Sequence, residues 1–240
     1  MSRVPSGIPG FDELIQGGFA ENTVNLISGP PGSAKTLFAL SFIYYGAKNY
    51  NERGLYLTLE EGREKTERAM KSYGMDYESL EIANKFQLFD FSAIRKECSA
   101  EEELREGLVS FERLQEFLEK YIQFSKPKRF VLDSLTAVGF YYKDENILRR
   151  EMFKFGRFLS EKKLTSLLIT ESPRGTGTTR YGVEEYIADS HIALGYENVQ
   201  GEFRRTVTIY KMRFTQHDPY KRPFLIMDTG IEVSPDEMLK

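Results

Sequence analysis

Residues 28–36 read SGPPGSAKT, and the types and spacing of these residues suit a loop that binds phosphate. Small residues let successive backbone N–H groups turn towards phosphate oxygens, and the N-terminus of a following helix favours negative charge. In such a loop Lys35 neutralises the β- and γ-phosphates of ATP or ADP, and the hydroxyl of Thr36 binds Mg²⁺. The alternative is a Gly-Pro turn that does no more than cap a helix. The nucleotide contacts expected from the loop are Gly29, Pro30, Gly32, Ser33, Ala34, Lys35, Thr36 and Leu37.

Ala34 occupies a position of this loop where glycine is expected. Alanine fits there, and favours the start of the helix, if its backbone is right-handed helical. A positive φ would instead cost on the order of 1–2 kcal/mol because of the Cβ atom. A penalty of that size weakens binding by roughly tenfold without abolishing it. The sequence leaves both conformations open.

Carboxylates end two of the apolar runs. Asp133 ends the run RFVLD, and strand C-termini surround the ligand crevice of an open α/β sheet. We therefore expect Asp133 beside the loop, where it holds the water shell of Mg²⁺. Glu60 and Glu61 end the run YLTLEE, where such a pair supplies a general base that activates water against the γ-phosphate. Their alternative role is at a helix N-terminus, where acidic residues complement the macrodipole.

Strands and helices that alternate along the chain are expected to position these residues. Short apolar runs predict strands buried on both faces, as in a parallel sheet. Apolar residues at helical spacing fill the gaps between the runs. This alternation predicts an α/β fold with a doubly wound sheet and right-handed crossovers. The predicted strands are residues 23–28, 54–59, 85–91, 129–134, 165–170 and 190–194, and the helical stretches are 35–48, 61–73, 108–124 and 152–159.

The last third of the chain changes character. Residues 204–214 and 222–228 read as strands with little helix between them, which predicts an antiparallel extension at one edge of the sheet. The sequence contains no Gly/Ser linker and no internal repeat, and its 240 residues fit one domain. We expect a single domain over residues 1–240.

Composition indicates which kinds of partner and which cellular compartment the chain suits. Thirty-six acidic and 33 basic residues give a net charge of −3, with no field of one sign to attract nucleic acid or an anionic membrane. Cys98 is the only cysteine, which excludes an intramolecular disulfide and favours a reducing interior. The N-terminus lacks an apolar signal region, and no apolar run reaches the length that spans a bilayer. The expected location is the cytoplasm.

The order of these segments resembles that of the single-domain KaiC-like ATPases, relatives of RecA and RadA that are common in archaea. The resemblance covers about Ser6 to Ile231, and its ordered segments are more specific than the phosphate loop alone. The segments are GIPGFDELIQGGF, GPPGSAKT, YLTLEE, GMDYESL, RFVLDSLTAV, LLITE, RYGVEEYIADS and YKMRFTQHD followed by RPF.

The resemblance implies a RecA-like P-loop fold and a ring, usually a hexamer, with ATP between neighbouring subunits. By motif, Asp133 matches the Walker B carboxylate, and Glu60 and Glu61 match the paired catalytic glutamates. Lys211 and Arg213 of the KMR segment match residues that reach the γ-phosphate in the adjacent subunit, as an arginine finger does in trans. Glu171 ends a strand where relatives of the fold carry a polar residue that senses the γ-phosphate.

Three departures from the family pattern matter. Ala34 replaces the usual glycine of the loop, which affects affinity and the rate of hydrolysis. Phe214 follows Arg213 where the family usually has glycine. The cyanobacterial clock protein phosphorylates an adjacent Ser-Thr pair in the region of GVEEYIADS, but this chain offers Glu185 and Tyr186 there, so we expect no clock-type autophosphorylation.

Three functions follow from this sequence. The first is a ring-forming ATP-binding protein with slow, Mg²⁺-dependent hydrolysis that alters contacts with an unidentified protein partner. The second is an ATP sensor that barely hydrolyses its ligand. The third is a recombinase paralogue that acts on DNA through the loop 173–182, which carries Arg174 and Arg180. The negative net charge disfavours DNA, and His191 and His217 lie too far apart in sequence to suggest a metal site.

Overall fold

A computed structural model describes residues 1–91, 109–173, 179–199 and 201–238. At its centre five strands run parallel, and almost all of their side chains are buried because helices cover both faces. These strands are β3 (Val24–Gly29), β4 (Gly54–Thr58), β5 (Phe86–Asp90), β6 (Arg129–Asp133) and β7 (Thr165–Glu171).

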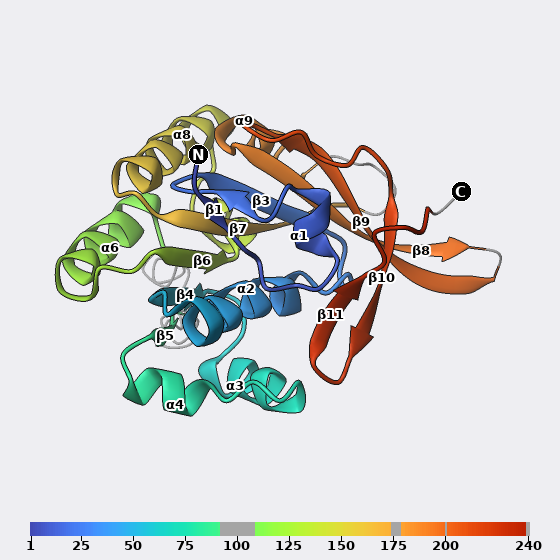
Figure 1. Cartoon of the computed structure of the whole chain (residues 1–240). Helices are drawn as coiled ribbons and strands as arrows, with labels where there is room; N and C mark the ends of the chain where they lie inside the picture. The colour runs from blue at the N-terminus through green and yellow to red at the C-terminus, as the bar shows by residue number, and fades with distance from the viewer. Residues whose placement is uncertain (92–108, 174–178, 200, 239–240) are drawn as a thin grey trace.

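An antiparallel extension continues this sheet on the β3 side. Strand β8 (Ser190–Val199) pairs in parallel with β3 and antiparallel with β9 (Glu202–Met212). Strands β10 (Arg222–Met227) and β11 (Gly230–Val233) follow, also antiparallel. The resulting order across the described residues is β11-β10-β9-β8-β3-β7-β6-β4-β5 (Figure 1). This confirms the predicted mostly parallel sheet with an antiparallel C-terminal extension.

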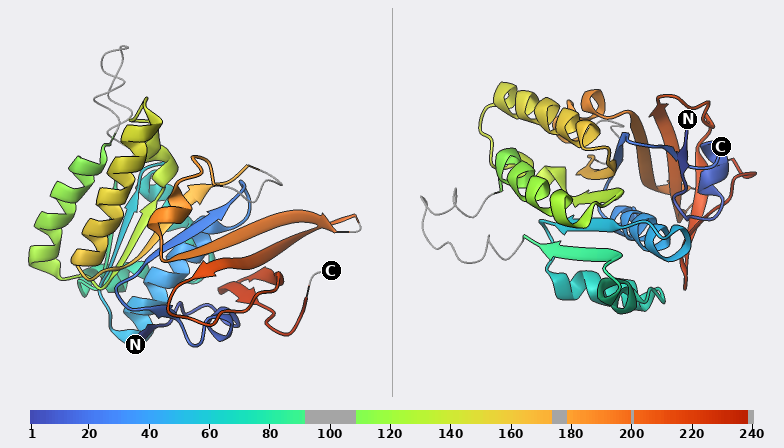
Figure 2. Two further views of the ribbon diagram at one scale, coloured as in Figure 1. Left: turned by 90° about the horizontal axis from the view of Figure 1, so that it is seen from above. Right: turned by 60° about the vertical axis from the view of Figure 1, so that its left-hand side comes forward.

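Helices form a layer on each face of the sheet (Figure 2). Helix α2 (Lys35–Tyr50) packs on one face, with α3 (Arg63–Ser72) and α4 (Tyr77–Ile82) beside it. Helices α6 (Phe111–Ser125) and α8 (Glu145–Glu161) cover the other face. Side chains alternate across β3, so Leu26 points into the α6–α8 cluster and Ile27 into the α2 cluster.

Short elements that the apolar spacing did not predict complete the fold. They are β1 (Arg3–Val4), α1 (Phe11–Leu14), β2 (Phe19–Ala20), α7 (Leu135–Gly139) and α9 (Glu184–Ile187). Among the described residues no helix combines the length and the apolar character needed to cross a membrane.

Candidate nucleotide-binding site

The phosphate loop connects the end of β3 to the start of α2, as its sequence predicted. Gly29 is required by close packing, because a Cβ atom there would lie 2.4 Å from the carbonyl oxygen of Leu194. Gly32 has a φ of +84°, which favours glycine. The loop therefore needs small residues at both positions to follow its path.

Ala34 adopts the positive-φ conformation that the sequence left as one of two possibilities. It is the N-cap of α2, with φ 71° and ψ 27°, in the left-handed region. Its Cβ atom therefore carries a cost on the order of 1–2 kcal/mol. Phe214, the other residue that replaces a glycine of the resembled family, also has a positive φ, of 62°. At both positions the backbone keeps a conformation that favours glycine although the side chain has changed.

Asp133 lies beside the phosphate loop, as the position of its strand predicted. The Thr36 hydroxyl donates a hydrogen bond of 2.9 Å to Asp133 Oδ2. The hydroxyl of Tyr56, on the neighbouring strand β4, donates to the same oxygen at 2.7 Å. Lys35 Nζ donates to the carbonyl oxygen of Pro30 at 3.1 Å, so the lysine folds back over the loop. The side chains expected to bind phosphate and Mg²⁺ are thus neighbours.

Burial and charge perturb the two ionisable groups at the loop. Burial raises the pKa of Asp133 to about 6, although the hydrogen bonds from Tyr56 and Thr36 act to lower it. The nearby Glu60 carboxylate raises the pKa of Asp133 further. Burial lowers the pKa of Lys35, against the opposing attraction of Asp133 and other carboxylates. The site therefore holds a buried carboxyl and a partly buried ammonium group close together.

Glu60 and Glu61 follow the C-terminal end of β4 and are exposed. Ser134, the residue after Asp133, donates a hydrogen bond through its hydroxyl to Glu60 Oε1. Helix α3 begins only at Arg63, and its first-turn acidic residue is Glu64. The expectation of a helix from residue 61 was therefore wrong at its start, and the glutamates lie outside that helix.

Glu171 lies at the end of β7, opposite Gly29 of β3 in the parallel register. Its backbone N–H donates to the hydroxyl of Thr136 at 3.0 Å. Its carboxylate accepts a hydrogen bond of 2.9 Å from Arg180 Nη1. The structure therefore brings Glu171 to the edge of the sheet that carries the phosphate loop.

Lys211 and Arg213 lie at the opposite end of β3, away from the phosphate loop of their own chain. Lys211 Nζ donates to the carbonyl oxygens of Glu185 at 3.0 Å and Ala188 at 2.6 Å. Arg213 Nη1 lies 3.2 Å from Asp189 Oδ1, and the other carboxylate oxygen of Asp189 accepts from the backbone of Val24. Since a strand rises about 3.3 Å per residue, the start of β3 is roughly 16 Å from its end. The structure does not bring these residues to the loop within one chain.

The loop residues fit the phosphate groups of a nucleotide with Mg²⁺. The N-cap of α2 receives no side-chain hydrogen bond, and the first turn contains no acidic residue. The buried Ser33 hydroxyl has no hydrogen-bond partner within the described part of the chain. These polar groups at a helix N-terminus suit the oxygens of a phosphate. Thr36 and Asp133 supply the hard oxygen ligands that Mg²⁺ prefers, directly or through water.

Three residues of the site were not predicted from the sequence. Tyr56 and Ser134 bond the carboxylates of Asp133 and Glu60, and Thr136 accepts the N–H of Glu171. Ser134 directly follows Asp133, so its position gave a usable signal. Tyr56 and Thr136 gave none, because their roles depend on which strands become neighbours.

The loop proposed for DNA contact is only partly described. Arg174 lies outside the described residues. Arg180 is in an ion pair with Glu171 and packs over the ring of Phe140 at 5.0 Å. The histidines have separate surroundings, since His191 Nε2 lies 2.7 Å from Ser28 Oγ and His217 Nδ1 lies 3.0 Å from a backbone oxygen.

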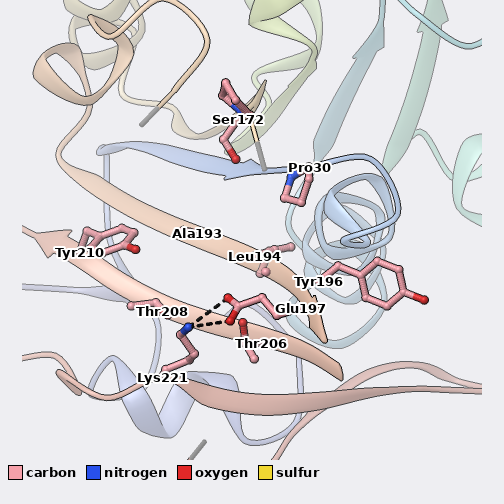
Figure 3. A pocket seen from close by; sticks show the side chains of 12 residues that line it. Pro30, Ser172, Ala193, Leu194, Tyr196, Glu197, Thr206, Thr208, Tyr210 and Lys221 are labelled. Carbon is pink, nitrogen blue, oxygen red and sulfur yellow. Dashed lines mark hydrogen bonds and ion pairs between the residues drawn. The ribbon is translucent and has the colours of Figure 1, made fainter. Parts of the chain in front are cut away.

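A cavity of about 310 Å³ flanks the phosphate loop on the side of the β8–β9 hairpin (Figure 3). Pro30 forms one wall, and Ser172, just after β7, lies beside it. An ion pair of 2.9 Å between Lys221 and Glu197 lines the cavity on the hairpin side. Of the residues predicted to bind nucleotide, only Pro30 lines this cavity.

Comparison with known proteins gives the family. A family profile described as "ATPase: KaiC" matches residues 4–238. A UPF0273 protein of Thermotoga maritima is 33% identical over 240 residues, covering 99% of this chain and 98% of its own. The circadian clock oscillator protein KaiC of Parathermosynechococcus lividus is 34% identical over 96% of this chain, which spans 42% of the clock protein. The crystal structure of a KaiC-like protein from Pyrococcus horikoshii OT3 superposes with a TM-score of 0.84 at 37% identity, covering 98% and 99% of the two chains. Its sequence and fold place this chain in the KaiC family of ATPases.

Proposed function

We propose that this protein binds ATP with Mg²⁺ and hydrolyses it slowly at the interfaces of a homo-oligomeric ring. The observation that carries the proposal is the 2.9 Å hydrogen bond between Thr36 and Asp133, which joins the phosphate loop to the carboxylate of β6. Lys35 lies in the same loop motif and is the first residue of α2. This combination of hydroxyl, carboxylate and lysine is the one that phosphoryl transfer in P-loop proteins requires.

Each side chain has a role in this proposal. Lys35 neutralises the β- and γ-phosphates, and Thr36 and Asp133 hold Mg²⁺ directly or through water. Mg²⁺ supplies charge neutralisation to the phosphates when it is bound. Glu60, with Glu61 beside it, orients the attacking water and accepts its proton, and the Ser134 hydroxyl holds the Glu60 carboxylate in place.

The placement of Lys211 and Arg213 supports the proposed ring. Arg213 lies beside the start of β3, roughly 16 Å along the sheet from the phosphate loop of its own chain, and Lys211 lies level with Leu26, roughly 10 Å from it. They complete a site only if they serve a neighbouring subunit, which requires a head-to-tail interface. Head-to-tail contacts close into rings when the rotation permits, and the hexamer is the ring size that we propose.

One observation favours a second function, that of an ATP sensor with little turnover. Ala34 holds a left-handed backbone at the N-cap of α2, and Phe214 does so directly after Arg213. Strain at the loop and at the finger segment would impair transition-state geometry more than ground-state binding. Both functions require ATP binding, so turnover distinguishes them.

The test is ATP binding and Mg²⁺-dependent hydrolysis by the purified protein and its Lys35→Ala variant. The control is Lys48→Ala, because Lys48 lies in the last turn of the same helix. We expect Lys35→Ala to lose nucleotide binding and Lys48→Ala to retain it. Binding without turnover in the wild type, restored to turnover by Ala34→Gly, would establish the sensor. Equal ATP binding by the wild type and Lys35→Ala would refute both functions.

We further propose that residues 1–240 act as one ATPase domain in the cytoplasm. Nucleotide state then alters the contacts that the ring makes with a protein partner. The cytoplasmic location rests on the single cysteine, Cys98, which suits a reducing compartment.

A further inference from the structure

Arg205 reaches from the β8–β9 hairpin to the phosphate loop. Its Nε donates a hydrogen bond of 3.1 Å to the carbonyl oxygen of Gly32. Arg205 and Gly32 are 173 positions apart in sequence, so the contact depends on how β8 and β9 pack beside β3. None of the motifs in the sequence assigns a role to this arginine.

The bond fixes one peptide plane of the phosphate loop at both ends. The carbonyl oxygen of Gly32 and the N–H of Ser33 belong to the same planar peptide unit and point in opposite directions. Ser33 N–H donates to the carbonyl oxygen of Pro30 at 3.2 Å, and Arg205 holds the carbonyl oxygen of Gly32. Both hydrogen bonds oppose a flip of this peptide. The orientation of this peptide in turn sets the orientation of the neighbouring N–H groups in the loop.

Aromatic packing holds the guanidinium of Arg205 in place. Its central carbon lies 4.6 Å from the ring centroid of Tyr196, its partner across the hairpin. The Tyr196 ring in turn lies 5.2 Å from that of Phe203. Tyr196 also lies under the loop, because a Cβ atom on Gly32 would be 3.6 Å from its ring. The hairpin therefore contacts the loop through both a charged hydrogen bond and an aromatic face.

We propose that Arg205, stacked on Tyr196, is a positioning residue that holds the phosphate loop in its nucleotide-binding conformation. This inference rests on the proposed function, because it assumes that the loop binds the phosphates of ATP. Arg205 acts through the loop backbone: it holds a carbonyl oxygen away from the phosphates, so that N–H groups face them. A carbonyl oxygen free to turn inwards would repel phosphate and cover donors that bind it.

The test is calorimetric titration with ADP and Mg²⁺ of the wild type, Arg205→Ala, Tyr196→Leu and the double variant. Because an exposed hydrogen bond contributes little, we expect ADP affinity to fall roughly three- to tenfold in each single variant. In the double variant the loss should be clearly less than the product of the two single losses, since the residues act as a unit. Tyr196→Phe keeps the ring and should bind ADP as the wild type does.

Arg204→Ala is the matched control, because Arg204 is the preceding residue and its guanidinium lies 3.2 Å from the Glu202 carboxylate. Unfolding without nucleotide is measured in parallel, and we expect it to be unchanged in Arg205→Ala. If Arg205→Ala binds ADP as tightly as the wild type while Lys35→Ala does not bind, the positioning role fails and the proposed function stands. The positioning role would also be refuted if Arg205→Ala lost as much free energy of unfolding without nucleotide as it lost free energy of ADP binding. Absence of ADP binding in the wild type would overturn both proposals.

Discussion

Ala34 holds a left-handed backbone, so its methyl group opposes the loop geometry in which it lies. Glycine relieves this strain, because it has no Cβ atom. We expect Ala34→Gly to raise the free energy of unfolding by about 1 kcal/mol. Chemical denaturation measures the change. Ala69→Gly, in the right-handed interior of α3, is the control and should lower the free energy of unfolding by about 1 kcal/mol. A loss of stability in both variants would show that the loop tolerates alanine without strain.

Asp133 must be ionised to hold Mg²⁺, and its pKa is raised by burial to about 6. We expect the Mg²⁺-dependent part of ATP affinity to fall as the pH drops below about 6, by up to about tenfold per pH unit. In the metal-free protein, the ionisation of Asp133 has the opposite effect: it lowers the free energy of unfolding. The raised pKa means that this group's contribution to stability is lost as the pH rises from 3.8 to about 6.

A variant of Tyr56 tests this pH dependence without removal of the Asp133 carboxyl. Its hydroxyl donates to Asp133 Oδ2, and that bond lowers the pKa of the carboxyl. Tyr56→Phe should therefore move the midpoint of the Mg²⁺ effect to higher pH, and Asp133→Asn should abolish the dependence. Titrations of ATP with and without Mg²⁺ between pH 5 and 8 measure the midpoint. An unchanged midpoint in Tyr56→Phe would show that another group controls it.

At the scale of elements, the buried side chain of Arg129 joins β6 to α2, to the N-terminal segment and to Glu52, which follows α2. Arg129, the first residue of β6, is fully buried and lies 2.7 Å from Glu52. It also donates to the carbonyl oxygens of Pro5 and Phe42, each at 2.8 Å. Removal of the arginine leaves the two carbonyl oxygens without this donor and Glu52 without its nearer cation.

We expect Arg129→Ala to lower the free energy of unfolding by about 3–5 kcal/mol, as measured in urea. Lys128→Ala is the matched control, because Lys128 is exposed and its Nζ lies 3.7 Å from the same glutamate. Its cost should stay within about 0.5 kcal/mol. Similar costs in both variants would show that β6 is held mainly by apolar packing.

The elements that the sequence predicted well are those with sustained periodicity. Strand β3 and helix α2 begin and end within a few residues of their predicted bounds, because buried apolar runs and helical spacing are local properties. Short elements such as α7 and α9 carry too few residues for a period to show. The start of α3 was placed two residues early because an acidic residue such as Glu61 is typical of a helix N-terminus.

Parts of the candidate site depend on tertiary contacts that no local pattern encodes. Lys35, Thr36 and Asp133 could be predicted to be neighbours, because strand ends meet at one edge of a parallel sheet. The backbone of Ala34 was left open, since alanine adopts both conformations. Arg205 could not be found, because its bond to Gly32 requires the hairpin to pack beside the loop.

At the scale of the whole molecule, the proposed function requires a site shared between subunits. Within one chain the phosphate loop lies at one end of β3, while Lys211 and Arg213 lie near the other end. Within one chain Arg213 is therefore held away from the phosphate loop, by its contacts with Asp189. If the ring exists, loss of Arg213 in one subunit impairs hydrolysis in its neighbour.

The most direct measurement is ATP hydrolysis by Lys35→Ala, by Arg213→Ala and by an equimolar mixture of the two, with subunit exchange checked by native mass spectrometry. Each variant alone should be inactive. In mixed rings, an intact loop from an Arg213→Ala subunit meets an intact finger from a Lys35→Ala subunit at about a quarter of the interfaces. We therefore expect the mixture to recover up to about a quarter of wild-type turnover. No recovery in rings shown to be mixed, or full activity of Arg213→Ala alone, would contradict a shared site.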